Sequence, residues 1–277
     1  MKSQHRLWAI VATYVMLLAS AALVVGPFIF SILTAFKTPK QFALEDPLTL
    51  PSPVTFDNFS ALFTGNHNFI VPLAVTAQVV LVMVVGQMFS SILAAYAFAH
   101  LRFPGREILF WIYLATLMVP AVVTIIPLYV MMTQAGLKNT FWGLVIPFMF
   151  GSPYAIFLLR ENFRAMPGEV LDAAKLDGAG VLRRLWHIVL PMNKPILATL
   201  LLITVVTHWN NFMWPKVIAP TPEWNVLTVA TANLQTQNAS NWTLVMAATT
   251  LALLPLILLF VAFQRQITRS IGIMGVR

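Results

Sequence analysis

The sequence predicts an all-α integral membrane protein with six transmembrane helices and both termini in the cytoplasm. Apolar residues make up 59% of its 277 residues and charged residues only 9%, whereas a soluble domain carries about 25% charged residues. So few charges cannot cover a surface that faces water, so the main solvent must be lipid. Several apolar stretches also reach the roughly 20 residues that a helix needs to cross a bilayer.

Six segments qualify as spans or come close, and they make residues 1–277 a single transmembrane domain. They are residues 8–36, 69–99, 108–132, 141–159, 195–215 and 242–263. The first segment has a signal peptide as its alternative, because Lys2 and Arg6 precede the apolar run. That run continues through Phe36, which is too long for the core of a signal peptide, and we therefore expect a retained helix.

The basic residues predict the orientation of the spans. With both termini inside, thirteen of the 17 Lys and Arg residues fall on the cytoplasmic side and four on the outer side. The outer four are Lys37, Lys40, Lys138 and Lys216. Cytoplasmic loops carry the excess of Lys and Arg in membrane proteins. The formal charge of +8 is thus explained by topology, and we expect no nucleic-acid partner.

Several function classes lose support from what the sequence lacks. It has no cysteine, so disulfides, thiolate metal sites and cysteine nucleophiles are impossible. The phosphate-binding pattern Gly-x4-Gly-Lys-Ser/Thr is absent, and the five histidines are scattered. We therefore expect a protein that is not an enzyme and binds no cofactor, and whose energy comes from a partner.

A passive channel or an ion-coupled carrier is the alternative of another class. The six predicted spans contain no Asp, Glu, Lys or Arg, whereas proton and sodium relays usually need intramembrane carboxylates. Proline, by contrast, is frequent in the spans, at positions 27, 72, 120, 127, 147, 153 and 255. Neighbouring helices and water can satisfy the carbonyls that proline frees, so we expect kinked helices, either around a cavity or simply packed together.

The cytoplasmic loop of residues 160–194 is too polar for lipid and has helical signals. Pro167 suits the first turn of a helix, with Glu169 and Asp172 near its positive end. Gly178 stands where a left-handed C-cap is expected. A second helical stretch is predicted from Val181 to Leu190, stopped by Pro191.

One face of the first loop helix is expected to be thin. Val170, Ala173, Ala174 and Asp177 follow the i, i+3, i+4, i+7 spacing of a helix face. Two adjacent alanines would let another protein surface approach closely. Spacing alone leaves open a helical hairpin that lies on the lipid headgroups.

A resemblance distinguishes these alternatives. The loop resembles the "EAA" signature of ATP-binding-cassette importer permeases: Glu-Ala-Ala, three residues, Gly, nine residues, then Ile-x-Leu-Pro. The matching residues are Asp172-Ala173-Ala174-Lys175-Leu176-Asp177-Gly178-Ala179 and Ile188-Val189-Leu190-Pro191. Asp172 departs from the pattern, because the family usually has Glu there. In that family the loop is the coupling helix that docks in a groove of the nucleotide-binding subunit, which implies that role for Glu169, Asp172, Ala173, Ala174, Asp177, Gly178 and Ala179.

Further fragments resemble the carbohydrate-type branch of that family, which includes maltose and glycerol-phosphate permeases. They are Ala94-Ala95-Tyr96-Ala97 with Arg102-Phe103-Pro104-Gly105-Arg106, Pro127-Leu128-Tyr129 with Gly136-Leu137-Lys138-Asn139-Thr140 and Gly143-Leu144, Trp209-Asn210-Asn211-Phe212-Met213-Trp214-Pro215, Gln264-Arg265, and Gly275-Val276-Arg277. The resemblance covers nearly the whole chain, although Asn211 replaces an acid.

The resemblance implies an ATP-driven, binding-protein-dependent importer in a bacterial cytoplasmic (inner) membrane. The partners it implies are a second permease subunit, two copies of a cytoplasmic ATPase that hold ATP and Mg²⁺, an extracytoplasmic solute-binding protein and membrane lipid. The expected cargo is a sugar or oligosaccharide, with glycerol 3-phosphate or a related polyol phosphate as the alternative. The outer stretches 37–68 and 216–241 are then part of the surface that meets the binding protein, or else they only close the bundle.

Polar side chains within the spans are candidates for the substrate pathway, because such residues are costly in lipid. Amides and flat aromatic faces suit sugar hydroxyls. The candidates are Gln78 on the second span and His208, Trp209, Asn210 and Asn211 at the outer end of the fifth. Hydrogen bonding between packed spans is the alternative role for each, and interfacial belt packing is the alternative for Trp209.

Overall fold

The computed structural model describes residues 2–64, 67–237 and 241–274, and every regular element in these ranges is a helix. The predicted all-α class is confirmed. Contacts divide the chain into one unit of Met1–Ile70 and Ala230–Pro255, and a second of Val71–Val229 and Leu256–Arg277. The tail Gly275-Val276-Arg277, residues 65–66 of the first outer stretch and residues 238–240 of the second lie outside the described residues.

Four helices in the described ranges are long and apolar enough to cross a membrane: Ile10–Ala35, Ile70–His100, Lys194–Ile218 and Trp242–Gln264. They correspond to the predicted first, second, fifth and sixth spans. The first lies within α1 (Lys2–Ala35) and the last within α15 (Trp242–Met274). The second is α4 (Ile70–His100), and the fifth combines α12 (Lys194–Trp209) with the short α13 (Met213–Ile218).

The third predicted span is broken rather than continuous. It consists of α5 (Arg106–Ala115), the 3-10 turn η1 (Thr116–Met118) and α6 (Ala121–Gln134), and the axes before and after the break differ by 100°. Pro120 lies at this break as the N-cap of α6. Proline has no N–H with which to continue the hydrogen bonding of a helix. The kink expected at Pro120 is therefore a sharp bend in the structure.

The fourth predicted span is interrupted as well. α7 (Phe141–Val145) ends early, residues 146–152 form turns, and α8 (Pro153–Arg164) begins at a proline. The predicted span of residues 141–159 is therefore not one continuous helix. α8 also runs to Arg164, so the first five residues of the predicted cytoplasmic loop belong to this helix.

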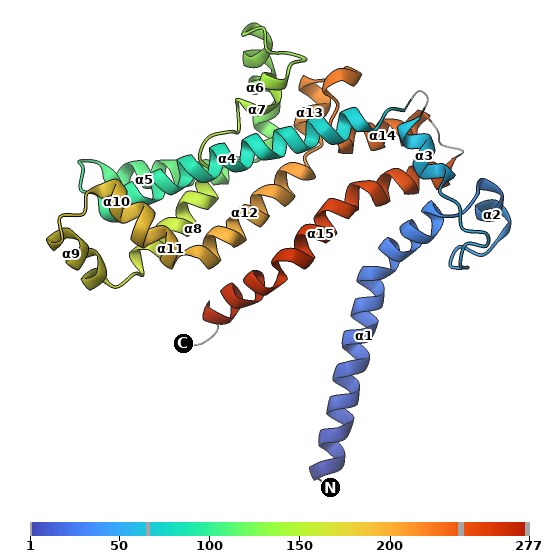
Figure 1. Cartoon of the computed structure of the whole chain (residues 1–277), viewed down its shortest axis with the longest axis horizontal. Helices are drawn as coiled ribbons and strands as arrows, with labels where there is room; N and C mark the ends of the chain where they lie inside the picture. The colour runs from blue at the N-terminus through green and yellow to red at the C-terminus, as the bar shows by residue number, and fades with distance from the viewer. Residues whose placement is uncertain (1, 65–66, 238–240, 275–277) are drawn as a thin grey trace. The chain divides into compact units, whose positions relative to one another are not determined.

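Two apolar clusters organise the second unit, and α4 contributes to both (Figure 1). In one cluster, Ile92 and Tyr96 of α4 pack with Leu159 and Phe163 of α8. In the other, Val79 and Met83 of α4 pack with α7 and α13. The first cluster also takes in residues of the predicted cytoplasmic loop, namely Leu171, Leu185 and Val189.

The first unit holds α1, α2 (Pro39–Leu44), α3 (Asp57–Phe63) and the start of α15. The Asn58 amide donates to the carbonyls of Ala35 and Lys37, each at 2.8 Å, and its oxygen accepts from Thr243 at 3.0 Å. Lys37 is buried, and its Nζ donates to Thr49 Oγ1 at 2.7 Å and to the Asp46 carbonyl at 3.1 Å. Polar contacts thus give the stretch after α1, which is predicted to lie on the outer side, a defined conformation.

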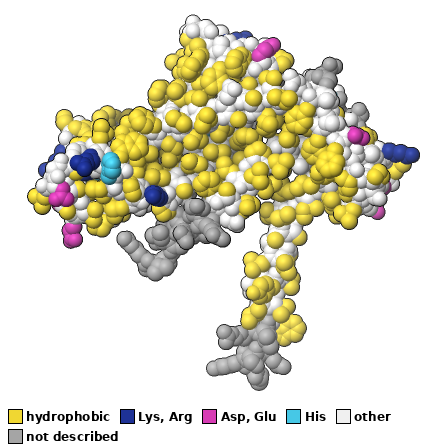
Figure 2. Space-filling model, in the orientation of Figure 1, with side chains coloured by type: hydrophobic (Ala, Val, Ile, Leu, Met, Phe, Trp, Pro, Cys, Tyr) yellow, Lys and Arg dark blue, Asp and Glu magenta, His cyan; other side chains and the backbone are white. Residues whose placement is uncertain are grey.

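The helices α14 (Leu227–Gln237) and η3 (Pro222–Trp224) complete the described chain. The face of the second unit that Figure 2 shows is largely hydrophobic along its middle, while Lys, Arg, Asp and Glu side chains gather at the end that holds α9 (Gly168–Leu176) and α10 (Val181–Arg184). This distribution is expected of a protein whose middle faces lipid and whose end faces water.

Candidate functional site

The polar segment after α8 folds as a hairpin of four short elements, which we term the coupling hairpin (residues 168–192). It consists of α9, α10, a π-type turn η2 (Leu185–Val189) and α11 (Leu190–Met192). Pro167 is the N-cap of α9, one residue before its predicted place. Glu169 lies in the first turn, where its negative charge faces the positive end of the helix.

The C-terminal end of α9 is closed by a Schellman motif around Gly178. Gly178 has a φ of 75°, the left-handed conformation that was predicted. The Ala179 amide donates to the Ala174 carbonyl at 2.9 Å and the Gly178 amide donates to the Lys175 carbonyl at 3.0 Å, which are the two bonds that define the motif. These bonds satisfy carbonyls that the helix end leaves open.

The two adjacent alanines of α9 face different environments, so the predicted thin face of Val170, Ala173, Ala174 and Asp177 is wrong in part. Ala174 is only 7% exposed and lies with the equally buried Leu171 on the inner side, whereas Ala173 and Asp177 face outward. The physical reason is that Leu171 and Ala174 are three residues apart and share one helix face, and Leu171 on that face packs in the first apolar cluster.

The outward side of α9 combines charge with one large apolar residue. Asp172 and Lys175 form an ion pair at 2.6 Å, and this pairing lowers the pKa of the Asp172 carboxyl. Leu176, directly before the C-cap, is 90% exposed. Sequence reasoning missed Leu176, although the leucine breaks the polar pattern of the helix end and was available as a signal.

The second half of the hairpin differs from its prediction. The helical stretch does not stop at Pro191, because it continues to Met192. In η2 the Leu190 amide donates to the Leu185 carbonyl, one residue further back than in an α-helix. Such a π-bulge accommodates a proline that would otherwise crowd the preceding turn.

The base of the hairpin is anchored in the apolar cluster. Leu185 and Val189 are fully buried there. The Asn193 amide donates to the Val189 carbonyl at 2.8 Å and to the Met166 sulfur at 3.1 Å, which joins the segment after the hairpin to the segment before it. A polar cavity of about 280 Å³ remains between α9 and the end of α4, lined by residues that include His100, Arg164 and Lys175.

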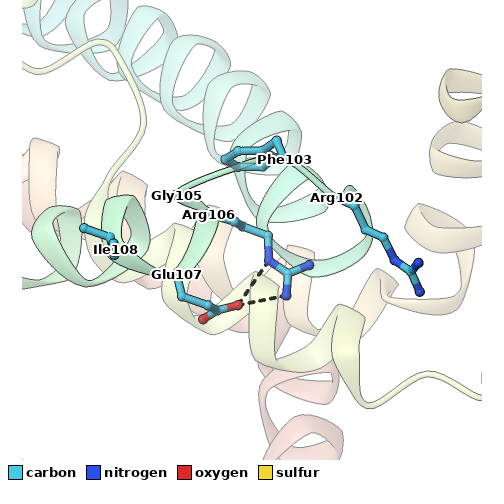
Figure 3. A pocket seen from close by; sticks show the side chains of 6 residues that line it. All are labelled: Arg102, Phe103, Gly105, Arg106, Glu107 and Ile108. Carbon is cyan, nitrogen blue, oxygen red and sulfur yellow. Dashed lines mark hydrogen bonds and ion pairs between the residues drawn. The ribbon is translucent and has the colours of Figure 1, made fainter.

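Arg160 lies beneath the hairpin, in the last turns of α8. Its guanidinium is bound to Glu107 of α5 at 2.7 Å and to Glu161 at 2.9 Å. Glu107 also pairs with Arg106 beside a cavity of about 460 Å³ at the α4–α5 turn (Figure 3). From sequence, Arg160 counts only as one of the basic residues that mark topology, and its burial depends on packing that no local pattern reveals.

Four of the five predicted pathway residues are consecutive in the sequence, and they lie at the C-terminal end of α12. Trp209 is buried and Asn210 is the C-cap, with its amide bound to the Val206 carbonyl of its own helix at 2.9 Å. His208 and Asn211 are half-buried. Gln78 is exposed on α4, and no hydrogen bond within the described ranges joins it to this group.

The interruption at residues 146–152 is the polar feature inside the spans that sequence reasoning missed. The Gln87 side-chain amide donates to the Phe148 carbonyl at 2.6 Å, and Ser91 Oγ accepts from the Ser152 amide at 3.1 Å. Tyr113 donates to the Gly151 carbonyl. A cavity of about 340 Å³ adjoins this segment, lined in part by Ser90, Tyr113 and Gly151.

Comparison with known families identifies the chain. Residues 86–273, which include the coupling hairpin, match the family described as "Binding-protein-dependent transport system inner membrane component". The chain belongs to this family. It is a transport permease, and the predicted membership of the importer-permease family is confirmed.

Individual relatives agree with this assignment. The permease is 32% identical to the sn-glycerol-3-phosphate transport system permease protein UgpE of Yersinia pestis, over 93% of this chain and 94% of that one. It is 30% identical to the arabinooligosaccharides transport system permease protein AraQ of Halalkalibacterium halodurans, over 93% of this chain and 92% of that one. It therefore has the length and the sequence of a permease subunit of an ATP-binding-cassette importer.

A solved structure supports the fold. A chain of a bacterial ABC transporter involved in the import of the acidic polysaccharide alginate aligns with a TM-score of 0.82 and 25% identity, over 94% of this permease and 96% of that chain. A chain of the alginate transporter in complex with an alginate pentasaccharide-bound periplasmic protein aligns with a TM-score of 0.68 and 18% identity, over 96% and 97% of the two chains.

Proposed function

We propose that this permease forms half of the translocation pathway of an ATP-driven importer, and that its coupling hairpin docks in a groove of a cytoplasmic ATP-binding-cassette ATPase. The observation that carries the proposal is the 90% exposure of Leu176 at the end of a capped helix. A helix that docks in a groove uses apolar side chains as anchors. The burial of Leu185 and Val189 in the apolar cluster fixes the base of the hairpin. This supports a hairpin that transmits force to the spans.

The proposed contact surface on the ATPase side comprises the outward part of the predicted set. It contains Glu169, Asp172, Ala173, Asp177, Gly178 and Ala179, with Leu176 added. Ala174 supports this surface from within, because it packs on the permease's own core.

A single substitution tests the docking. We expect Leu176→Ser to weaken co-purification with the ATPase by roughly tenfold or more, equivalent to about 1.4 kcal/mol, while membrane insertion is unchanged. Leu48→Ser is the matched control, because Leu48 is 70% exposed on the outer stretch. Equal ATPase binding by both variants would contradict the docking surface.

The proposed topology has six spans, with both termini on the cytoplasmic side of a bacterial inner membrane. The bent pair α5–α6 forms the third span, and α7, residues 146–152 and α8 form the fourth. The excess of basic residues at the cytoplasmic ends of the spans supports this orientation. Labelling of single introduced cysteines from either side of the membrane would test it, and the cysteine-free chain makes each label specific.

The energy of transport is proposed to come from two copies of the ATPase, which hold ATP and Mg²⁺, while this permease binds neither. A second permease subunit completes the pathway, and an extracytoplasmic solute-binding protein delivers the cargo. The family's dependence on binding proteins and the solved alginate transporter complex with its periplasmic protein support the last partner.

The proposed cargo is a sugar or oligosaccharide. Relatives are named for arabinooligosaccharides and for diacetylchitobiose uptake. The second candidate is glycerol 3-phosphate, favoured by the similarity to UgpE. Calorimetric titration of the associated binding protein with arabino-oligosaccharides, diacetylchitobiose and sn-glycerol 3-phosphate distinguishes them, since we expect only one class to bind.

Within this chain, His208 and Asn211 are the proposed pathway residues with side chains free of the helix cap. Asn210, Trp209 and Gln78 are weaker candidates, given the cap and burial described above. The irregular segment of residues 146–152 is a further candidate, because it adjoins a cavity and irregular backbone at membrane depth is tolerated where it is buried in protein or lines a cavity.

A further inference from the structure

Arg160 is a buried cation that reaches three helices. Its side chain is 4% exposed, and its Cζ atom lies 3.9 Å from the centre of the Phe110 ring. Its Nε atom donates to the Phe98 carbonyl at 3.4 Å, while its two terminal nitrogens bind Glu161 and Glu107. A guanidinium presents its donors in a rigid planar fork, so Arg160 fixes its three acceptor groups relative to one another.

The contacts of Arg160 fall on both sides of the α4–α5 turn. Phe98 lies in the last turn of α4, Glu107 in the first turn of α5 and Phe110 one turn further along. The turn also has a clasp of its own, since Arg106 donates to the Leu101 carbonyl at 3.0 Å and to Glu107. Arg160 adds the connection from this clasped turn to α8.

α8 leads directly into the coupling hairpin. It ends at Arg164, and only residues 165–167 separate it from α9. Two residues of this region are fully buried in the same cluster, Phe163 in α8 and Leu185 in the hairpin. Packing contacts therefore run from the hairpin to α8, and through Arg160 to the turn between α4 and α5.

A charge needed only for topology would not be expected in this position. Burial of a cation without a partner is strongly unfavourable, and basic residues that only mark the cytoplasmic side are satisfied by water. Arg164, one turn along the same helix, behaves in that way, with a half-exposed side chain 3.9 Å from Glu161. Arg160 is instead enclosed, with contacts to α4, to α5 and to Glu161 of its own helix.

We propose that Arg160 is a positioning residue that makes the α4–α5 turn and the coupling hairpin move as one body during transport. The inference rests on the proposed docking of the ATPase, because that docking supplies the movement. Arg160 lies outside the docking surface proposed above, and it acts through α8. A lysine cannot replace it, since an ammonium lacks the planar fork that engages two carboxylates and a carbonyl together.

The cysteine-free chain permits a direct distance measurement. Spin labels are introduced at two exposed positions, Pro104→Cys in the α4–α5 turn and His187→Cys in η2. The distance distribution between them is measured by pulsed electron paramagnetic resonance, in the whole transporter complex in nanodiscs, without nucleotide and with ATP and vanadate. We expect one narrow distribution that is nearly the same in both states.

Four variants separate positioning from general folding. Arg160→Gln and Arg160→Lys are each expected to broaden the distribution at least twofold and to raise the ATP hydrolysed per cargo molecule transported. Glu107→Gln, at a half-exposed position, should have the same effect. Arg164→Gln is the matched control and should leave the distribution narrow.

The double variant Arg160→Gln/Glu107→Gln should give a distance distribution no broader than that of either single variant, because both substitutions remove the same connection. The proposal is overturned if Glu107→Gln and Arg160→Lys keep the narrow distribution, or if Arg164→Gln broadens it equally. Failure of the ATPase to bind the unaltered permease would sink the proposed function instead. The nucleotide-free distributions would still decide whether Arg160 joins the two elements.

Discussion

The Gln87 side-chain amide donates to the carbonyl oxygen of Phe148 at 2.6 Å, which joins α4 to the interruption of the fourth span across 61 positions of sequence. Gln87 is only 9% exposed. In lipid no water replaces a lost partner, so this single amide satisfies a carbonyl that the broken helix leaves open. The interruption leaves the Phe148 carbonyl without a helical donor, and the Gln87 amide supplies that donor.

Replacing Gln87 therefore tests how the interruption is stabilised. We expect Gln87→Leu to lower the free energy of unfolding by about 1–3 kcal/mol, because a buried carbonyl loses its donor. Gln78→Leu is the matched control on the same helix, at an exposed position, and should change it by less than about 0.5 kcal/mol. Thermal unfolding in detergent measures both, and equal stability of the two variants would contradict the role of Gln87.

Gly86 allows α4 to approach the same segment closely. A Cβ atom at this position would lie 2.2 Å from the Met149 carbonyl oxygen, well inside van der Waals contact, so the backbone must shift. We expect Gly86→Ala to destabilise the permease by about 1–3 kcal/mol and to increase proteolysis within residues 146–152. Gly26→Ala, where the added Cβ meets no atom within 4 Å, should be neutral; the reverse order would show that the approach is unimportant.

Gly178 is required by backbone conformation rather than by space. Its φ is 75°, and an added Cβ would meet no atom within 4 Å. We expect Gly178→Val to cost about 1–2 kcal/mol of local stability, to loosen the end of α9 and to reduce co-purification with the ATPase, while insertion is retained. Gly178→Asn should recover much of the binding, because Asn tolerates the left-handed region.

Gly168→Ala provides the comparison for Gly178. It lies in the same hairpin, without a positive φ and with open space around it, so ATPase binding should be unchanged. Normal binding and transport by Gly178→Val would refute the role of the cap.

Lys37 stabilises the stretch that follows α1. Its side chain is 1% exposed and donates to Thr49 and to the Asp46 carbonyl. We expect Lys37→Met to lower the free energy of unfolding by about 1–3 kcal/mol, because these acceptors lose their donor, and to raise protease cleavage within residues 45–50. The exposed neighbour Lys40 supplies the control, and Lys40→Met should leave cleavage unchanged.

The sequence by itself determined the all-α class and the position of the coupling hairpin. Composition requires lipid as solvent, and the spacing from Pro167 to Gly178 specifies a helix with its C-cap through local backbone preferences alone. Helix-capping preferences act over a few neighbouring residues, so they can be read from the sequence without knowing how the helices pack. The same holds for the long apolar runs that became α4 and α15.

Only the tertiary structure decided how the third and fourth spans break and what their breaks bind. Prolines 120 and 153 mark the positions, but the 100° bend and the contacts of Gln87, Ser91 and Tyr113 depend on which helices lie alongside. Packing likewise decided that Ala174 is buried and Ala173 exposed. The two residues are adjacent and chemically identical, so the sequence alone does not distinguish them. Arg160 became a buried connection for the same reason, because burial is set by residues that are distant in sequence.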